Sequence, residues 1–161
     1  MQVWRSLDEI PAGIGSTVVV IGNFDGVHRG HQSVIGRARE IADHDGHALV
    51  AVTFDPHPMA VLRPEHAPSA LTTLEARTAL LAEIGVDHVF ALPFSREIAA
   101  WSPEEFIDRV LVEGLHAAAV VVGANFRFGS RASGDLATLV EAGASRGFVA
   151  KGVALDGGPQ V

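Results

Sequence analysis

The fold of this chain is decided by residues 17–42, which read TVVVIGNFDGVHRGHQSVIGRAREIA. The run opens with the β-branched stretch Thr17–Ile21, as expected of a strand that is buried on both faces. A glycine-rich segment follows, and from His31 to Ala42 the apolar residues recur at helical spacing. Strand, glycine-rich loop and helix in this order are typical of a parallel α/β domain.

The same alternation continues along the chain. Further strands are predicted at residues 48–54, 86–92, 117–122 and 148–153. Further helices are predicted from a capping box at Thr72 and Glu75 to Gly85, from Ser102 to Gly114, and over 135–142. We therefore expect an α/β, doubly wound, Rossmann-like domain over residues 1–161, with a five-stranded parallel sheet covered by helices on both faces.

Composition excludes several classes of protein. With 48% hydrophobic and 19% charged residues, the chain is too apolar to be disordered. The net charge of −7 argues against a general nucleic-acid-binding surface. The absence of cysteine excludes disulfides and thiolate metal sites, and no apolar run reaches the roughly 18 residues of a membrane span. We expect a cytoplasmic protein with no nucleic-acid or membrane partner.

Unusual polar and aromatic clusters follow three of the predicted strands. They occupy residues 22–31 (GNFDGVHRGH), 53–58 (TFDPHP) and 123–129 (GANFRFG). Ligands of open parallel sheets bind outside the carboxyl ends of the strands, so these clusters are expected to share one edge of the sheet. The long connection over residues 56–70 is expected to be a substrate loop or a plain surface excursion.

The first cluster carries two histidines, His28 and His31, where a predicted helix begins. A helix N-terminus favours phosphate, and imidazoles there are able to donate hydrogen bonds to phosphate oxygens. This arrangement indicates phosphoryl or nucleotidyl transfer without a covalent intermediate. The same residues are consistent with ordinary loop histidines, or with a zinc pair of His-x-x-His spacing.

The other two clusters supply flat apolar surface and possible phosphate ligands. Phe54, with the prolines around His57, suits an aromatic ligand, although a rigid turn with a core phenylalanine fits equally well. In the third cluster Arg127 is suited to clamp a phosphate, or to be an exposed arginine between core phenylalanines. Asn125 is suited to contact a phosphate or a metal-bound water.

Together these segments resemble the adenylyltransferase module of bacterial bifunctional riboflavin kinase/FMN adenylyltransferase, the prokaryotic FAD synthetase. GNFDGVHRGH is similar to the HxGH signature of nucleotidylyltransferases, and TFDPHP and VGANFRFG to the second and third motifs of the family. The segment LTTLEAR (residues 71–77) is similar to the stretch between them. The resemblance implies an HxGH nucleotidylyltransferase fold and the reaction of FMN with ATP to give FAD and pyrophosphate, with Mg²⁺.

The resemblance also implies roles for individual residues. His28 and His31 would be catalytic and stabilise the pentacoordinate α-phosphorus. The ATP site would be lined by Gly22, Asn23, Phe24, Gly30 and Asn125. The flavin site would be formed by Phe54, Pro56, His57, Pro58, Arg127 and Phe128. Mg²⁺ would be held through the ATP phosphates, with Asn125 as a possible protein contact.

Two features of the family are expected to lie outside residues 1–161: a phosphate motif rich in Ser and Thr after the last strand, and a C-terminal riboflavin kinase domain. An incomplete phosphate clamp would weaken adenylyl transfer. Two alternatives therefore stay open. The first is another HxGH nucleotidylyltransferase with a different acceptor, and the second is a non-catalytic module that binds flavin or nucleotide.

Overall fold

The computed structural model describes residues 1–25, 29–66 and 73–154. Their elements follow one another in strict alternation along most of the chain. In chain order they are β1 (Gln2–Trp4), η1 (Leu7–Glu9), β2 (Thr17–Ile21), α1 (Arg29–Asp45), β3 (Ala48–Phe54), α2 (Pro58–Leu62), η2 (Pro64–His66), α3 (Leu74–Glu83), β4 (His88–Leu92), α4 (Arg96–Ala99), α5 (Pro103–Phe106), η3 (Ile107–Gly114), β5 (Ala117–Gly123), η4 (Ser130–Ala132), α6 (Leu136–Arg146) and β6 (Val149–Val153).

The strands form one parallel sheet in the order β1-β4-β3-β2-β5-β6. This confirms the predicted α/β class, and the predicted strands reappear with small shifts at their ends. The predicted strand count of five is wrong, because the described part of the chain forms a sheet of six. The additional strand, β1, is only three residues long and pairs in parallel with β4 at the edge of the sheet.

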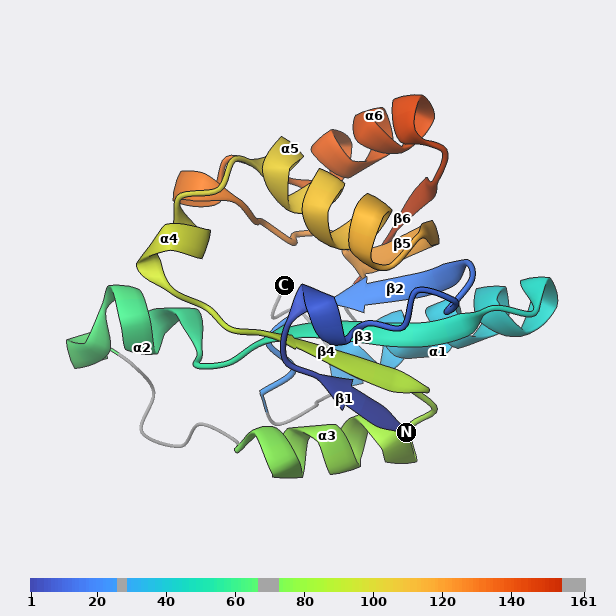
Figure 1. Ribbon diagram of the computed structural model, residues 1–161, viewed down its shortest axis with the longest axis horizontal. Coiled ribbons are helices and arrows are strands. Elements are labelled where there is room, and N and C mark those ends of the chain that lie inside the picture. The colour runs from blue at the N-terminus through green and yellow to red at the C-terminus, as the bar shows by residue number, and fades with distance from the viewer. Residues whose placement is uncertain (26–28, 67–72, 155–161) are drawn as a thin grey trace.

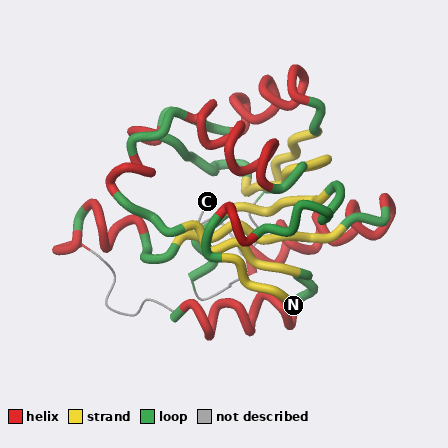
Figure 2. Tube along the Cα trace, in the orientation of Figure 1, coloured by secondary structure: helices red, strands yellow, loops and turns green. Residues whose placement is uncertain are grey.

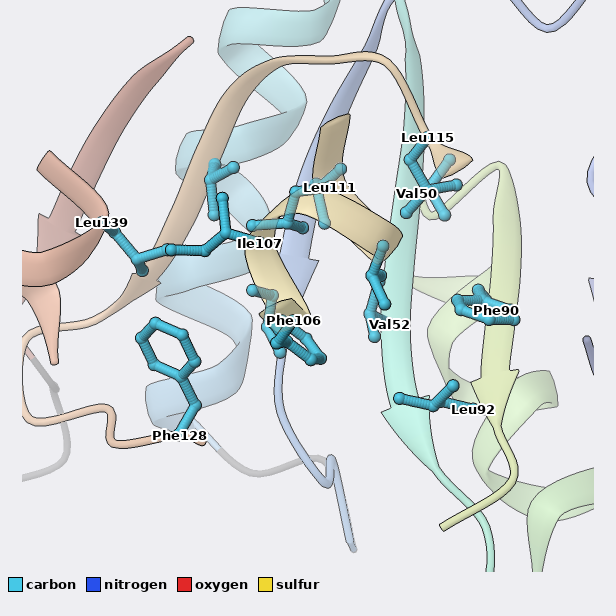
Figure 3. Close-up of a cluster of buried hydrophobic side chains, with 14 of the residues drawn as sticks. Val50, Val52, Phe90, Leu92, Phe106, Ile107, Leu111, Leu115, Phe128 and Leu139 are labelled. Atoms are coloured by element: carbon cyan, nitrogen blue, oxygen red, sulfur yellow. The ribbon is translucent and has the colours of Figure 1, made fainter. Parts of the chain in front are cut away.

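Helices cover both faces of the sheet, as the doubly wound prediction requires (Figures 1 and 2). The buried strand β2 divides its side chains between the two faces, because successive side chains of a strand point in opposite directions. Val18 and Val20 pack with Ile35 of α1 and Leu81 of α3. On the opposite face the core is built around α5, η3 and α6 (Figure 3), and its buried members include Val50, Val52, Phe90, Leu92, Phe106, Ile107, Leu111, Leu115 and Leu139.

Side-chain caps fix where the helices begin. The predicted start at Ser102 is confirmed, since its hydroxyl accepts a hydrogen bond from the amide of Glu105 at 3.1 Å and Pro103 takes the first helical position. The predicted capping box is off by one residue. Thr73 caps α3 by accepting from the amide of Ala76 at 3.1 Å, and Thr72 lies outside the described residues.

The helix that starts at Ser102 does not stay regular to its end. After α5 it widens into the π-helix η3, in which the amide of Leu115 donates to the carbonyl of Val110 at 2.9 Å. The predicted end at Gly114 is confirmed. The wider turn directs Ile107, Val110, Leu111 and Leu115 into the same core, where all of them are fully buried.

The chain reverses its direction of travel across the sheet between β2 and β5. From β2 it proceeds through β3 to β4 on one side, and the later strands β5 and β6 lie on the other. β2 and β5 are neighbours, but the loops that follow them lead to opposite sides of the sheet. In parallel sheets, a ligand crevice opens between two such loops. Within the residues that the structure describes, no helix is long and apolar enough to span a membrane.

Candidate active site

A cavity of about 780 Å³ lies at this crevice, at the carboxyl edge of the sheet. Its walls come from the segments that follow β2, β3, β4 and β5, so four strands contribute to one site. As predicted, the clusters at residues 22–31, 53–58 and 123–129 meet at this edge, and each contributes described residues to the lining. The volume falls within the range of about 300–1,000 Å³ that is usual for small-molecule sites.

The loop after β2 forms the floor of the cavity. The amide of Gly22 continues the sheet by donating to the carbonyl of Val52 at 3.0 Å, and the chain then turns sharply. Phe24 adopts φ of +52° and folds its ring back over Gly22. A Cβ atom at Gly22 would lie 3.3 Å from that ring, so a side chain there would require the ring to shift by a few tenths of an ångström.

Phe24 therefore supports the site from beneath, and only 1% of its surface is exposed. Its ring meets the ring of His31 edge to face, with 5.2 Å between the centroids. His31 lies in the first turn of α1 and lines the cavity beside Asn23. The Oδ1 atom of Asn23 is buried and has no hydrogen-bond partner among the described residues, which makes it available to a ligand.

Two of the predicted residues are only partly covered by the structure. His28 lies outside the described residues. Gly30 lies in the first turn of α1, whose described part begins at Arg29. Of the two histidines in the HxGH pattern, the structure therefore describes only His31.

The segment after β3 turns into a short helix that forms one rim of the cavity. The Nδ1 atom of His57 accepts a hydrogen bond from the amide of Met59 at 3.0 Å and so caps α2. Burial lowers the pKa of His57 below its ordinary value; the Arg77 guanidinium adds to this lowering, and Asp25 opposes it. Because Nδ1 accepts this hydrogen bond, the neutral form of the ring carries its proton on Nε2.

The expected substrate loop over residues 56–70 is more ordered than a plain connection. It contains α2 and η2, and residues 67–70 lie outside the described part. His57, Pro58 and Leu62 line the cavity. Pro56, which the resemblance places in the flavin site, is exposed to solvent and does not line the cavity. Pro58 at the first position of α2 turns the chain back toward the cavity, whereas Pro56 precedes that turn.

Aromatic rings form another part of the cavity wall. Phe54 packs edge to face on Phe94 with centroids 5.9 Å apart, and it also contacts Phe106 at 6.4 Å. Phe106 in turn contacts Phe128 at 5.6 Å, and Phe126 stacks on Phe128 at the same distance. Such a continuous apolar surface suits a large flat ligand ring.

The loop after β5 closes the cavity and is tied to the start of α5. The amide of Ser130 donates to the carbonyl of Trp101 at 2.8 Å. Gly129 adopts φ of +79° and packs so tightly on Pro103 that a Cβ atom there would lie 2.7 Å from the proline ring. These contacts hold the exposed side chains of Asn125 and Arg127 at the cavity mouth.

The ionisable side chains around the cavity are mostly basic, although the chain carries a net charge of −7. Among the described lining residues, the carboxylate of Asp25 is outnumbered by the imidazoles of His31 and His57 and the guanidiniums of Arg127 and Arg131. Local concentration of guanidinium and imidazole groups favours an anionic ligand despite the acidity of the whole chain. The cavity thus combines an aromatic wall with a basic, donor-rich mouth.

Few of the described side chains around the cavity are suited to bind a metal ion. The described residues contain no group of three or more His, Cys, Asp or Glu side chains able to hold a metal ion. The zinc alternative requires His28, which lies outside the described residues. The amide oxygens of Asn23 and Asn125 are the kind of neutral oxygen donor that Mg²⁺ accepts when most of its ligands come from phosphates and water.

Several lining residues were missed by the sequence prediction, namely Leu62, Phe94, Ile98, Trp101, Phe106, Phe126 and Arg131. A signal for Phe94 was present, because it follows the predicted strand over residues 86–92 and so falls under the same rule of strand carboxyl ends. Trp101 carried no such signal. It precedes the helix cap Ser102, and its ring is held by the guanidinium of Arg109, 5.1 Å from the ring centroid.

Comparison with known proteins agrees with this geometry. The family model described as FAD synthetase matches residues 11–155. The bifunctional riboflavin kinase/FMN adenylyltransferase of Pseudomonas fluorescens is 41% identical over 160 residues, a match that covers 98% of this chain and 51% of that protein. The protein of the same name from Escherichia coli K12 is 38% identical over 131 residues, covering 81% of this chain and 42% of that protein.

A solved structure from Streptococcus pneumoniae, named as a macrolide-efflux protein, superimposes with a TM-score of 0.80 at 26% identity. That match covers 94% of this chain and 49% of the other. The chain spans about half the length of the curated relatives it matches. The family match extends over nearly all of the chain, including each of the three clusters around the cavity. The chain belongs to the FAD synthetase family.

Proposed function

We propose that the protein transfers the AMP group of ATP to the phosphate of FMN, giving FAD and pyrophosphate. The observation that carries the proposal is one cavity in which a wall of aromatic rings adjoins a basic, donor-rich mouth at the crevice of the sheet. A flavin supplies the flat ring and both substrates supply phosphates. The relatives from P. fluorescens and E. coli are named as FMN adenylyltransferases, which supports the choice of acceptor.

The isoalloxazine ring of FMN is proposed to bind against Phe54, Phe128 and the rings between them, with His57 and Pro58 at its edge. The phosphates are proposed to bind at the mouth, near Gly22, Asn23, Asn125 and the first turn of α1. The free N–H groups and the dipole of a helix N-terminus attract phosphate at that position. In this arrangement the FMN phosphate and the ATP α-phosphate meet between the two regions.

The reaction is a displacement at the α-phosphorus of ATP. A phosphate oxygen of FMN forms the new bond to the α-phosphorus, the bond to the β-phosphate oxygen breaks, and pyrophosphate leaves. The FMN phosphate is ionised at neutral pH, so the protein needs no general base or covalent nucleophile. His31 is proposed to donate to the oxygens on which negative charge accumulates, and His28 is proposed as the second donor.

The described residues fit Mg²⁺ that arrives with ATP better than a metal site made by the protein, since the cavity offers amide oxygens and no cluster of acids. Asn125 is the proposed protein contact of that ion. When bound, Mg²⁺ neutralises part of the phosphate charge. The chain itself orients the two substrates and supplies the donors.

The relatives carry riboflavin kinase in their names as well. We infer that the full-length protein pairs this domain with a riboflavin kinase domain and acts in the cytoplasm, where FMN made by one domain is the acceptor of the other. Residues 1–161 are proposed to catalyse adenylyl transfer only. Riboflavin itself, which lacks the attacking phosphate, is therefore expected to be inert with this chain.

The proposal is tested by chromatographic measurement of FAD formed from FMN and Mg-ATP. His31→Ala and His28→Ala are each expected to lower kcat by about 10²–10³, the usual loss for one transition-state donor. His44→Ala is the matched control, because His44 is on the same helix with its side chain 89% exposed. Unchanged turnover in His31→Ala refutes the role of His31. Activity with a non-flavin acceptor alone identifies a different nucleotidylyltransferase.

A further inference from the structure

Arg77 in α3 is a buried charge close to, but not lining, the cavity. It is 4% exposed, and it is the one charged side chain in the buried core of the described residues. Its Nη1 atom donates to the hydroxyl of Thr53 at 2.8 Å and to the carbonyl of Phe54 at 3.1 Å. A buried guanidinium is costly unless its donors are used, so this position demands a reason.

The chemistry of arginine fixes the direction of the hydrogen bonds. A guanidinium has only donors, so the Thr53 oxygen must accept from Arg77. The single hydroxyl proton of Thr53 is then left for its other neighbour, the backbone carbonyl of Asn23, 3.0 Å away. Thr53 is fully buried, which excludes water as a competing partner. A one-way chain of hydrogen bonds therefore runs from Arg77 through Thr53 to Asn23.

This chain ends at the residue that precedes the strained turn of the site. Asn23 is followed by Phe24, which has φ of +52° and supports the ring of His31 at 5.2 Å. At the same time Arg77 holds the carbonyl of Phe54, whose ring lines the aromatic wall. Arg77 is thus bonded directly to the carboxyl end of β3 and, through the Thr53 hydroxyl, to the segment that follows β2; both segments contribute residues to the cavity.

We infer that Arg77 is a positioning residue: through Thr53 and the Asn23 carbonyl it fixes Phe24, and through Phe24 the ring of His31. Its effect on turnover rests on the proposed adenylyl transfer, whereas its effect on the ring of His31 does not. Loss of the chain lets the turn at Asn23 and Phe24 relax. His31 then no longer points its donor at the transition state, although the substrates still bind.

The test compares three variants. Arg77→Met keeps the aliphatic length and removes the donors. Thr53→Val keeps the shape of threonine and removes only the hydroxyl in the middle of the chain. Arg39→Met is the matched control, because Arg39 also donates to a loop carbonyl, that of Gly85 at 2.7 Å, and to Asp87 at 2.9 Å, away from the cavity lining. Arg77→Lys keeps a donor and a charge and is the rescue variant.

Two readouts are taken at a temperature where every variant is folded. The first is the NMR shift of the His31 ring protons, which the neighbouring Phe24 ring displaces. Arg77→Met and Thr53→Val are expected to move this shift toward that of an unstructured histidine, while Arg39→Met leaves it unchanged. The second is steady-state FAD formation, in which the same two variants lose up to about 10² in kcat with little change in either KM. Arg77→Lys recovers part of both.

Unchanged His31 ring shifts in Thr53→Val overturn the inference, as does an equal loss of kcat in Arg39→Met. If the unaltered protein forms no FAD, the proposed function fails, and the ring shifts alone decide the role of Arg77. If Arg77→Met does not fold, Thr53→Val decides, because it leaves the arginine in place.

Discussion

Replacement of Gly129 by alanine is expected to damage both the stability of the domain and the shape of the cavity. Gly129 has φ of +79° and ψ of 177°, a region of the backbone map that is essentially restricted to glycine. A Cβ atom there would also lie 2.7, 2.9 and 2.9 Å from Cγ, Cδ and N of Pro103. The substitution therefore incurs a backbone cost and a packing cost together.

The backbone cost is about 1–3 kcal/mol, and overpacking against a rigid proline adds about 1–3 kcal/mol. We expect Gly129→Ala to lower the free energy of unfolding by about 2–6 kcal/mol. In a chain of this length each kcal/mol moves the Tm by about 2–4 °C, so the Tm should fall by roughly 4–24 °C. The loop would move away from Pro103, which displaces Asn125 and weakens ATP binding.

Two other glycines separate these costs in urea or thermal unfolding. Gly147 has φ of +87° and ψ of 27° but no atom within 4 Å of a built Cβ, so Gly147→Ala measures the cost of a left-handed backbone alone, about 1–2 kcal/mol. Gly36 lies within α1 with open space around it, and Gly36→Ala should stabilise by about 0.5–1 kcal/mol. If Gly129→Ala is no more destabilising than Gly147→Ala, the tight packing on Pro103 is refuted.

Further outcomes follow from His57, Phe106 and Asn125. Because the folded-state pKa of His57 lies below its ordinary value of 6.5, the unfolded chain takes up its proton first, and stability falls as the pH drops through 6.5 toward the folded pKa. Urea unfolding of His57→Asn, which keeps a capping side chain without titration, should show a shallower decline over that range; an equal decline contradicts the assignment. Phe106→Ala should cost about 3–5 kcal/mol of unfolding free energy and weaken FMN binding in calorimetry, since the ring is 5% exposed and serves both core and cavity. Asn125→Ala removes the amide proposed to contact the phosphates or Mg²⁺ and should raise the Kd of Mg-ATP, with no change in Tm because the side chain is exposed; an unchanged Kd would show that Mg-ATP does not bind there.

The parallel sheet was predictable because its buried strands carry strong patterns. The β-branched runs at β2 and β3 coincide with the predicted ranges 17–21 and 48–54. The edge strand β1 was missed because three residues are too few to show alternation, and its place in the sheet depends on pairing with β4. Pairing between segments more than eighty residues apart cannot be predicted from the sequence pattern of either segment alone.

Capping residues predicted one helix start correctly and another with an error of one residue. Ser102 was identified because proline and an acid follow it at the favoured positions. At the start of α3, two consecutive threonines offer two registers, and the spacing to Glu75 favoured Thr72. The structure uses Thr73, which turns Leu74, Arg77 and Leu81 toward the core. Burial of these side chains decided the register, and burial is a tertiary property.

The candidate site was predictable where it follows a strand and unpredictable where the chain folds back onto it. Asn125, Arg127 and Phe128 line the cavity as expected. Phe24, which the resemblance places in the ATP site, is among the lining residues of the cavity; its positive φ turns most of the ring into the core, where it contacts His31. Trp101 reaches the cavity through packing of α4 and α5 over the sheet, and no motif marks it.

The most direct test of the account follows the α-phosphate itself. The protein is incubated with Mg²⁺, FMN and ATP labelled at the α-phosphorus, and the flavins are separated by chromatography. We expect label to enter FAD in equal amount to the pyrophosphate released, and riboflavin in place of FMN to give no labelled flavin. Saturable binding of FMN and ATP with no labelled FAD would contradict it and would identify a binding module instead of a nucleotidyltransferase.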